Sequence, residues 1–249
     1  MKSDCILECC VDSVESALAA AAGGADRLEL CAALMIGGTS PGIALFEQIK
    51  ENCSLPVRVL LRPRFGDFLY TEHEFQIIKR EVELFAQAGA DGIVIGCLKA
   101  DGSLHMEWMR ELVSAAGDLG ITLHRAFDVC ADPVQTYEQA QELGIDTILT
   151  SGQEKDCLTG LPLLKRLSEL QKRTGGPQIM AGAGVTPEVI RKFRMKTDIK
   201  AYHLSAKKLV DSGMQYRREG VPMGIAAMSE YQIFRTDQEI VEQAKLALE

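Results

Sequence analysis

The sequence predicts an α/β protein that folds as a single (β/α)8 barrel of the TIM type. Eight short apolar segments begin near residues 6, 27, 57, 92, 121, 147, 178 and 201, and a helical pattern fills each gap between them. Strands that alternate with helices run parallel, and eight such strands favour a closed barrel over an open sheet. The length of 249 residues is also typical of one barrel domain.

The first strand, helix and second strand set the pattern for the rest of the chain. Ile6–Cys10 and Arg27–Cys31 are mostly apolar runs, and Ser13–Ala22 between them has the composition of a helix. A Gly-x-Asp motif lies before the second strand at residues 24–26, and it returns at 89–91 and 144–146. Its glycine suits the left-handed conformation that commonly ends a helix, so each motif marks a passage from helix to strand.

Apolar spacing and capping residues predict the later helices. The clearest helix carries Phe75, Ile78, Val82 and Phe85 on one face. Asp132-Pro133 and Thr186-Pro187 each combine an N-cap residue with a proline suited to the first turn of a helix. Further helical patterns occupy residues 43–49, 106–116 and 161–170.

One segment does not fit the alternation of strands and helices. Residues 206–235 contain several glycines and show weak periodicity, so we expect an irregular segment there. A loop of this length commonly serves function or an interface, and it would either cover the barrel mouth or contact another subunit. A final helix is expected over residues 236–249, with Thr236 or Asp237 as its cap.

Composition excludes several classes of partner. The net charge of −8 argues against nucleic acid or an anionic membrane, and no stretch approaches the roughly twenty apolar residues of a membrane span. The start of the sequence lacks the basic and apolar regions of a secretion signal. We therefore expect a soluble, cytoplasmic protein whose eight cysteines are reduced thiols.

Polar side chains gather at the C-terminal ends of the predicted strands, where barrel enzymes place their active sites. Side chains alternate along a strand, so Glu8 and Cys10 share one face of the first strand, and Glu29 and Cys31 share one face of the second. One interpretation is a self-satisfied network in which Arg62 is held by both glutamates. The other is a binding site made from the same groups. The strand-end residues are Glu8, Cys10, Glu29, Cys31, Arg62, His124, Thr150, Ser151, His203 and Ser205.

An enzymatic role would use these groups on a small anionic or phosphorylated metabolite. Glu8, Glu29, His124 and His203 have the character of a divalent-metal site or of a general acid and base, as in a metal-dependent isomerase, lyase or aldolase. Arg62 would hold the anionic group. Backbone N–H groups near Gly182 and Gly184, together with Ser205, would assist it, because this position matches the usual phosphate site of barrels. By contrast, Arg64 and Asp67 are expected only to pair across a turn.

Several blocks of the sequence also resemble one protein family. They are residues 10–17, 24–31, 62–64 with 66–68, 124–128, 149–152 and 211–214, which together resemble the CutC family of copper homeostasis proteins. The resemblance covers nearly the whole chain in the same order. It implies a cytoplasmic barrel that is usually oligomeric, with a homodimer as the first expectation. It also implies that copper is bound as Cu(I), with Cys10 and Cys31 in the positions of the family's proposed ligands.

Overall fold

The computed structural model describes residues 5–218, 220–221, 223 and 229–249, and it confirms the (β/α)8 barrel. Eight parallel strands close into one ring in the order β1-β2-β3-β4-β5-β6-β7-β8. They are β1 (Ile6–Val11), β2 (Arg27–Leu30), β3 (Val57–Leu60), β4 (Gly92–Ile95), β5 (Gly120–Leu123), β6 (Thr147–Thr150), β7 (Gln178–Ala181) and β8 (Ala201–Leu204). Seven strands begin at the residue that the sequence predicted, and β5 begins one residue earlier.

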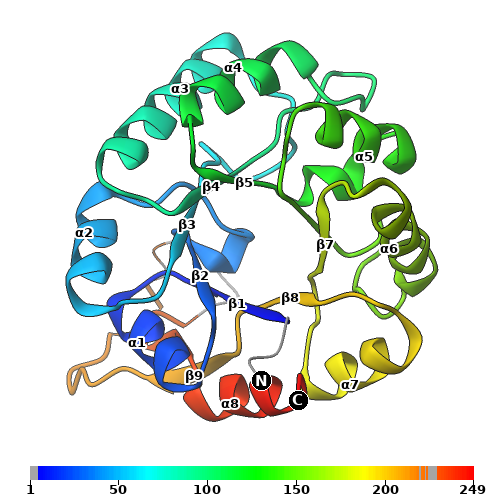
Figure 1. Cartoon of the computed structure of the whole chain (residues 1–249). Helices are drawn as coiled ribbons and strands as arrows, with labels where there is room; N and C mark the ends of the chain where they lie inside the picture. Colours follow the sequence, from blue (N-terminus) through cyan, green and yellow to red (C-terminus); the bar gives the residue numbers. More distant parts are fainter. Residues whose placement is uncertain (1–4, 219, 222, 224–228) are drawn as a thin grey trace.

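Helices surround the ring of strands, as the view along the barrel shows (Figure 1). They are α1 (Val14–Ala22), α2 (Ile43–Asn52), α3 (Glu72–Gln87), α4 (Met106–Ala116), α5 (Pro133–Glu142), α6 (Leu161–Thr174), α7 (Pro187–Lys196) and α8 (Gln238–Leu246). Two short 3-10 helices, η1 (Leu34–Ile36) and η2 (Arg125–Val129), lie in loops. Among the described residues, no helix combines the length and the apolar character that crossing a bilayer requires.

The predicted capping residues begin their helices. The side chain of Asp132 accepts hydrogen bonds from the backbone N–H groups of Val134 and Gln135 at the start of α5. Thr186 accepts from the N–H of Val189 at the start of α7. These side chains satisfy N–H groups that have no partner within a helix, which is why the helices start there.

Strand β1 shows how the barrel separates its two faces. Leu7, Cys9 and Val11 are fully buried and pack into the large core between the strands and the helices. Cys10 packs instead with Cys31 and with residues of β3 and β4, in a second cluster inside the barrel. The predicted alternation is therefore confirmed, and it turns Glu8 and Cys10 toward the interior.

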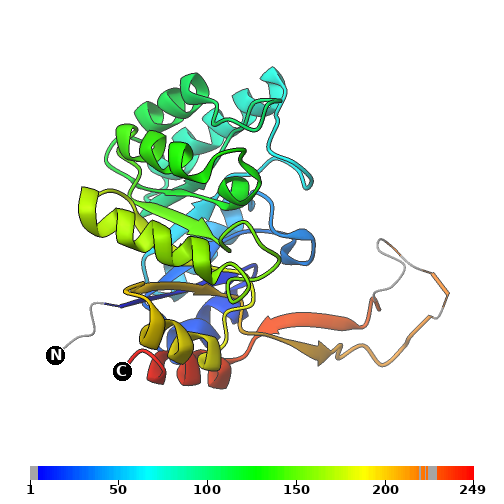
Figure 2. The ribbon, with the colours of Figure 1, turned by 90° about the vertical axis from the view of Figure 1, so that its right-hand side faces the viewer.

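The prediction of an irregular segment over residues 206–235 is partly wrong. Strands β9 (Lys207–Asp211) and β10 (Gln232–Thr236) form an antiparallel pair, and this hairpin reaches away from the barrel (Figure 2). Every residue of β9 is exposed, so β9 lacks the apolar alternation that reveals a half-buried strand. Residues 219, 222 and 224–228 of this segment lie outside the described part. Helix α8 starts after Asp237, which is its cap, while Thr236 belongs to β10.

Candidate functional site

A cavity of about 620 Å³ opens at the C-terminal ends of the barrel strands. Its walls come from the ends of β1, β2, β3, β6 and β8 and from the loops that follow β2, β3, β5, β7 and β8. The structure brings most of the predicted site residues together at this cavity, although Glu8 and Gly182 are not in its wall. The predicted residues that line it are Cys10, Glu29, Cys31, Arg62, His124, Gly184, His203 and Ser205.

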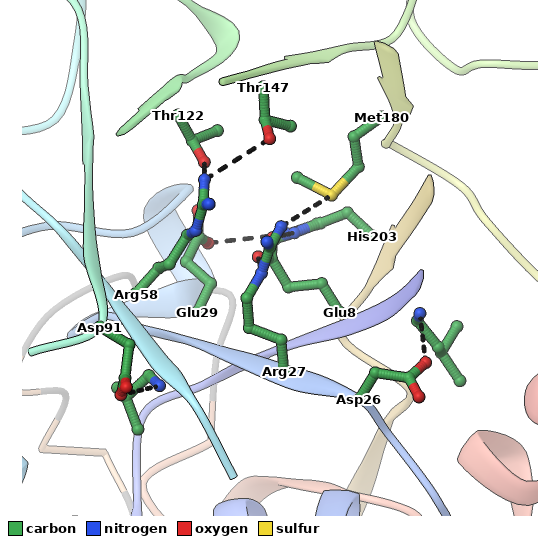
Figure 3. A network of polar contacts seen from close by, with 12 residues as sticks. Glu8, Asp26, Arg27, Glu29, Arg58, Asp91, Thr122, Thr147, Met180 and His203 are labelled. Atoms are coloured by element: carbon green, nitrogen blue, oxygen red, sulfur yellow. Dashed lines mark hydrogen bonds and ion pairs between the residues drawn. The ribbon is translucent and has the colours of Figure 1, made fainter. Parts of the chain in front are cut away.

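Below the cavity, the interior of the barrel holds a network of buried charges (Figure 3). Glu8 is fully buried, and its carboxylate accepts a hydrogen bond from Arg27 Nε at 2.5 Å and another from His203 Nδ1 at 2.8 Å. Arg58 lies in the same interior and donates to the hydroxyl of Thr122 at 2.6 Å. Glu8, Arg27 and His203 thus connect β1, β2 and β8, and Arg58 connects β3 with β5.

The sequence prediction missed Arg27, which is the principal partner of Glu8. In the strand pairing, Glu8 lies beside Arg27, so the two side chains enter the barrel at the same level. Because Arg27 is two residues before Glu29, strand alternation alone places it on the same inward face. That signal was available in the sequence, but the register between β1 and β2 was not.

The two buried glutamates have opposite electrostatic environments. Burial would raise the pKa of Glu8, but the charges of Arg27 and His203 and their hydrogen bonds hold it down at about 2. Burial raises the pKa of Glu29 to about 7, and His203 offsets this only in part while the charge of Glu8 adds to it. At neutral pH, Glu8 is therefore an anion, whereas Glu29 is close to its midpoint.

Cys10, Glu29 and His203 form a group that can hold a metal ion. Their ligand atoms all lie within 4.8 Å of one another. His203 donates from Nδ1 to Glu8, which leaves Nε2 on the side of Glu29 Oε2, 3.6 Å away. A carboxylate that orients a histidine in this way is a common feature of metal sites. The thiol and the imidazole suit copper or zinc, and the carboxylate is a harder ligand.

Cys31 lies in the same buried cluster as Cys10, as the alternation of the strands required. Its thiol donates a hydrogen bond to the carbonyl oxygen of Val11 at 3.5 Å. Burial, followed by the charges of Cys10 and Glu29, raises the pKa of Cys31 well above its ordinary value. The Cys31 thiol is therefore protonated at neutral pH unless a metal ion replaces the proton.

The expected network of Arg62 with Glu8 and Glu29 is wrong. Arg62 follows the end of β3, and its guanidinium donates to the carbonyl oxygens of Gly37, Gly38 and Gly66 at 3.3, 3.1 and 2.6 Å. It thus lies among the mouth loops, whereas Arg27 takes the place beside Glu8 inside the barrel. The pairing of Arg64 with Asp67 is confirmed, with a distance of 3.0 Å between Nη2 and Oδ1.

His124 is buried in the wall of the cavity next to Arg62. Its Nδ1 accepts a hydrogen bond from the N–H of Ala126 at 3.2 Å, and its ring lies 4.7 Å from the ring of Phe68. Gly96 provides the room, because a Cβ atom there would come within 2.7 Å of the imidazole. Burial, followed by the charge of Arg62, lowers the pKa of His124 to about 3, so its imidazole is neutral.

The predicted anion-binding residues lie on the far side of the cavity from Arg62. Gly184 and Ser205 line the wall, whereas the N–H of Gly182 donates to the carbonyl of Thr150 and extends the barrel pairing. Strands β3 and β7 are four positions apart in the ring of eight, which puts them on opposite sides. Because Arg62 and Gly184 follow strands on opposite sides of the ring, an anion held by both would have to reach across the cavity mouth.

Two further lining residues were not predicted as part of a site. Arg125 and Asp128 lie in η2, and Arg125 Nε donates to Asp128 at 2.7 Å. Asp128 also accepts from the hydroxyl of Thr150 at 2.5 Å and from the N–H of Ser151 at 3.0 Å. Thr150, which ends β6, and Ser151, which follows it, thus position Asp128 and are not part of the cavity wall.

Comparison with known proteins identifies relatives over most of the chain. A family model described as the CutC family matches residues 5–208. A CutC family protein of Parabacteroides distasonis is 45% identical over 240 residues, covering 95% of this chain and 98% of that protein. The human protein named copper homeostasis protein cutC homolog is 41% identical over 233 residues, covering 93% and 85%. The crystal structure of CutC from Streptococcus agalactiae matches with a TM-score of 0.75 at 26% identity, covering 81% and 98%.

Proposed function

The chain belongs to the CutC family, and from this premise we propose that it takes part in copper homeostasis by binding Cu(I) at the barrel mouth. The ligands in this proposal are the thiolates of Cys10 and Cys31. The observation that carries it is the shared position of these two residues in one buried cluster at the wall of the cavity. Soft thiolate ligands favour Cu(I), and two of them suffice in a site of low coordination number.

The surroundings of Cys10 support a bound thiolate. Burial lowers the pKa of His203, but Cys10, Glu29 and Glu8 around it hold that pKa well above its ordinary value. A protonated imidazole beside Cys10 compensates the negative charge that the sulfur acquires when it binds a metal ion. Glu29, with a pKa of about 7 and an oxygen within 4.8 Å of the Cys10 sulfur, is suited to accept the released proton.

Competition titrations with Cu(I) and a coloured Cu(I) chelator test the proposal on the purified, reduced protein. We expect one copper ion per chain in the wild type. Cys10→Ala and Cys31→Ala should each weaken the affinity by about a hundredfold or more, because each removes a direct ligand. Cys9→Ala is the matched control, since Cys9 is equally buried but packs on the opposite face of β1.

Two results would count against this assignment. Equal affinity in the wild type and in Cys10→Ala would remove Cys10 from the site, and a loss in Cys9→Ala alone would place the ion elsewhere. X-ray absorption of the copper complex gives an independent readout, because two sulfur ligands are expected. We also propose a cytoplasmic location, because cysteines that bind Cu(I) must stay reduced, and the cytosol keeps thiols reduced.

A further inference from the structure

We propose that the mouth cavity also binds a small organic anion, whose negatively charged group is held by Arg62 beside His124. The group is the oxyanion of a phosphate monoester or of a carboxylate, which present the same acceptor atoms to a guanidinium. This site goes beyond copper binding and does not depend on it. Its residues come from the ends of β3 and β5, whereas the proposed copper ligands come from β1 and the end of β2.

The size of the cavity is the first argument. At about 620 Å³ it falls within the range of roughly 300–1,000 Å³ that is typical of pockets for small molecules. A single metal ion uses only a small part of such a volume. The wall near Arg62 also includes Leu34, Leu60 and Phe68, so a carbon skeleton would meet apolar surface beside the charged group.

The charge of Arg62 is the second argument. Arg62 is only 8% exposed, and its guanidinium donates to three backbone carbonyl oxygens. Within the described ranges, no carboxylate lies within ion-pair distance of it. A buried cation without a counter-charge is unfavourable, and a bound anion would supply that charge. Phe68 packs against the guanidinium, with its ring centre 4.9 Å from Cζ, and this contact fixes its position.

Unpartnered polar atoms on this side of the mouth are the third argument. In the part of the chain that the structure describes, Arg62 Nε and His124 Nε2 are buried side-chain nitrogen atoms without a hydrogen-bond partner, and both residues line the cavity. The charge of Arg62 acts on the pKa of His124, so the two residues lie close together. Leaving a buried donor unpaired is unfavourable, and two such donors in one wall favour a ligand with acceptor oxygens.

His124 has the protonation state that this role requires. Its Nδ1 accepts from the N–H of Ala126, so the proton of the neutral ring is on Nε2. Nε2–H is therefore a neutral donor near the Arg62 guanidinium, and it adds a hydrogen bond without adding charge repulsion. Gly184 and Ser205 follow β7 and β8, across the ring from Arg62, and would face the other end of the ligand.

Isothermal titration of the metal-free protein, kept in a strong chelator, tests the site. The probes are inorganic phosphate, glycerol 3-phosphate and glycerate. Glycerol 3-phosphate carries a phosphate ester and glycerate a carboxylate on a similar carbon skeleton, so the comparison shows which of the two groups is bound. We expect saturable binding of at least one organic probe, with one site per chain. Arg62→Gln should weaken it about tenfold or more, and His124→Phe, which keeps an aromatic ring beside Phe68, by about threefold to tenfold.

Arg64→Gln is the matched control, because Arg64 lies in the same loop but pairs with Asp67 and Glu74 outside the cavity. It should bind the probe as the wild type does. Far-ultraviolet circular dichroism shows whether each variant is folded. If Arg62→Gln does not fold, His124→Phe alone decides the test. The proposal is overturned if no probe binds, or if Arg62→Gln and His124→Phe both bind as tightly as the wild type. Cys10→Ala should retain anion binding, so failure of the copper proposal would leave this one standing.

Discussion

The two buried glutamates provide a pair of substitutions with opposite expected effects on stability. Glu8→Gln and Glu29→Gln are nearly isosteric, and both act inside the barrel, where Glu8 is 0% and Glu29 5% exposed. Glu8 is paired with Arg27 and His203, so its charged form is stabilised in the folded state. Glu29 is buried without an adequate counter-charge, so its charged form is destabilised. At pH 8 we expect Glu8→Gln to destabilise the protein and Glu29→Gln to stabilise it.

The magnitudes follow from the pKa values. The pKa of Glu8 falls from 4.5 to about 2 on folding, which corresponds to roughly 3 kcal/mol of stability at neutral pH. This contribution is fully present above pH 4.5 and is lost as the pH falls toward 2. The pKa of Glu29 rises from 4.5 to about 7, so it costs roughly 3 kcal/mol above pH 7, and this cost disappears as the pH falls to 4.5.

Urea denaturation followed by the fluorescence of Trp108, the only tryptophan of the chain, measures both effects. At pH 8 we expect the urea midpoints of the two variants to move in opposite directions. In thermal denaturation, their melting temperatures should change by about 6–12 °C. At pH 5 the stability gained by Glu29→Gln should be only a small fraction of its value at pH 8. The stability lost by Glu8→Gln should be unchanged. If the two variants change stability by the same amount and sign at pH 8, the assignment of their charge states is refuted.

Two further predictions concern packing and assembly. Gly92→Ala should lower the melting temperature by about 2–10 °C, because its Cβ would lie 2.5 Å from the backbone carbonyl oxygen of Gly120 on the neighbouring strand β5. Gly213→Ala, with no atom within 4 Å, should have no effect in differential scanning calorimetry. We also propose that the protein is a homodimer in which a second copy covers one face of the hairpin, where the paired residues Val210 and Ile233 are 38% and 39% exposed. Light scattering should then show a monomer for the double Val210→Ser/Ile233→Ser variant, and an unchanged dimer mass would contradict this role of the hairpin.

The barrel was predictable because its signals are local and repeated. A parallel strand is covered on both faces, so it reads as a short apolar run such as β4 (Gly92–Ile95), and the capping residues Asp132 and Thr186 mark where helices start. Hairpin β9–β10 gave no such signal. Its first strand is exposed along its whole length, and exposure removes the alternation on which a prediction of a strand depends.

The candidate site was predictable in composition but not in its pairing. Alternation placed Glu8 and Cys10 on one face, and the closure of the barrel brought the strand ends to one cavity. The partner of Glu8 depends on the register of β1 against β2, which no local pattern encodes. Likewise, Arg62 binds carbonyl groups of loops at residues 37–38 and 66, whose positions depend on tertiary structure.

The charges inside the barrel are better explained by positioning than by stability. A barrel interior that needs only packing is filled by branched apolar residues, and replacing a buried ion pair by such residues is often neutral or stabilising. Here Arg27 holds Glu8, and Glu8 in turn holds the imidazole of His203 at 2.8 Å, where it meets Cys10 and Glu29. Apolar residues at these positions would keep the barrel but would leave His203 without a fixed orientation. The network therefore determines the charge and the geometry next to Cys10, which is the property that a metal-binding thiolate requires.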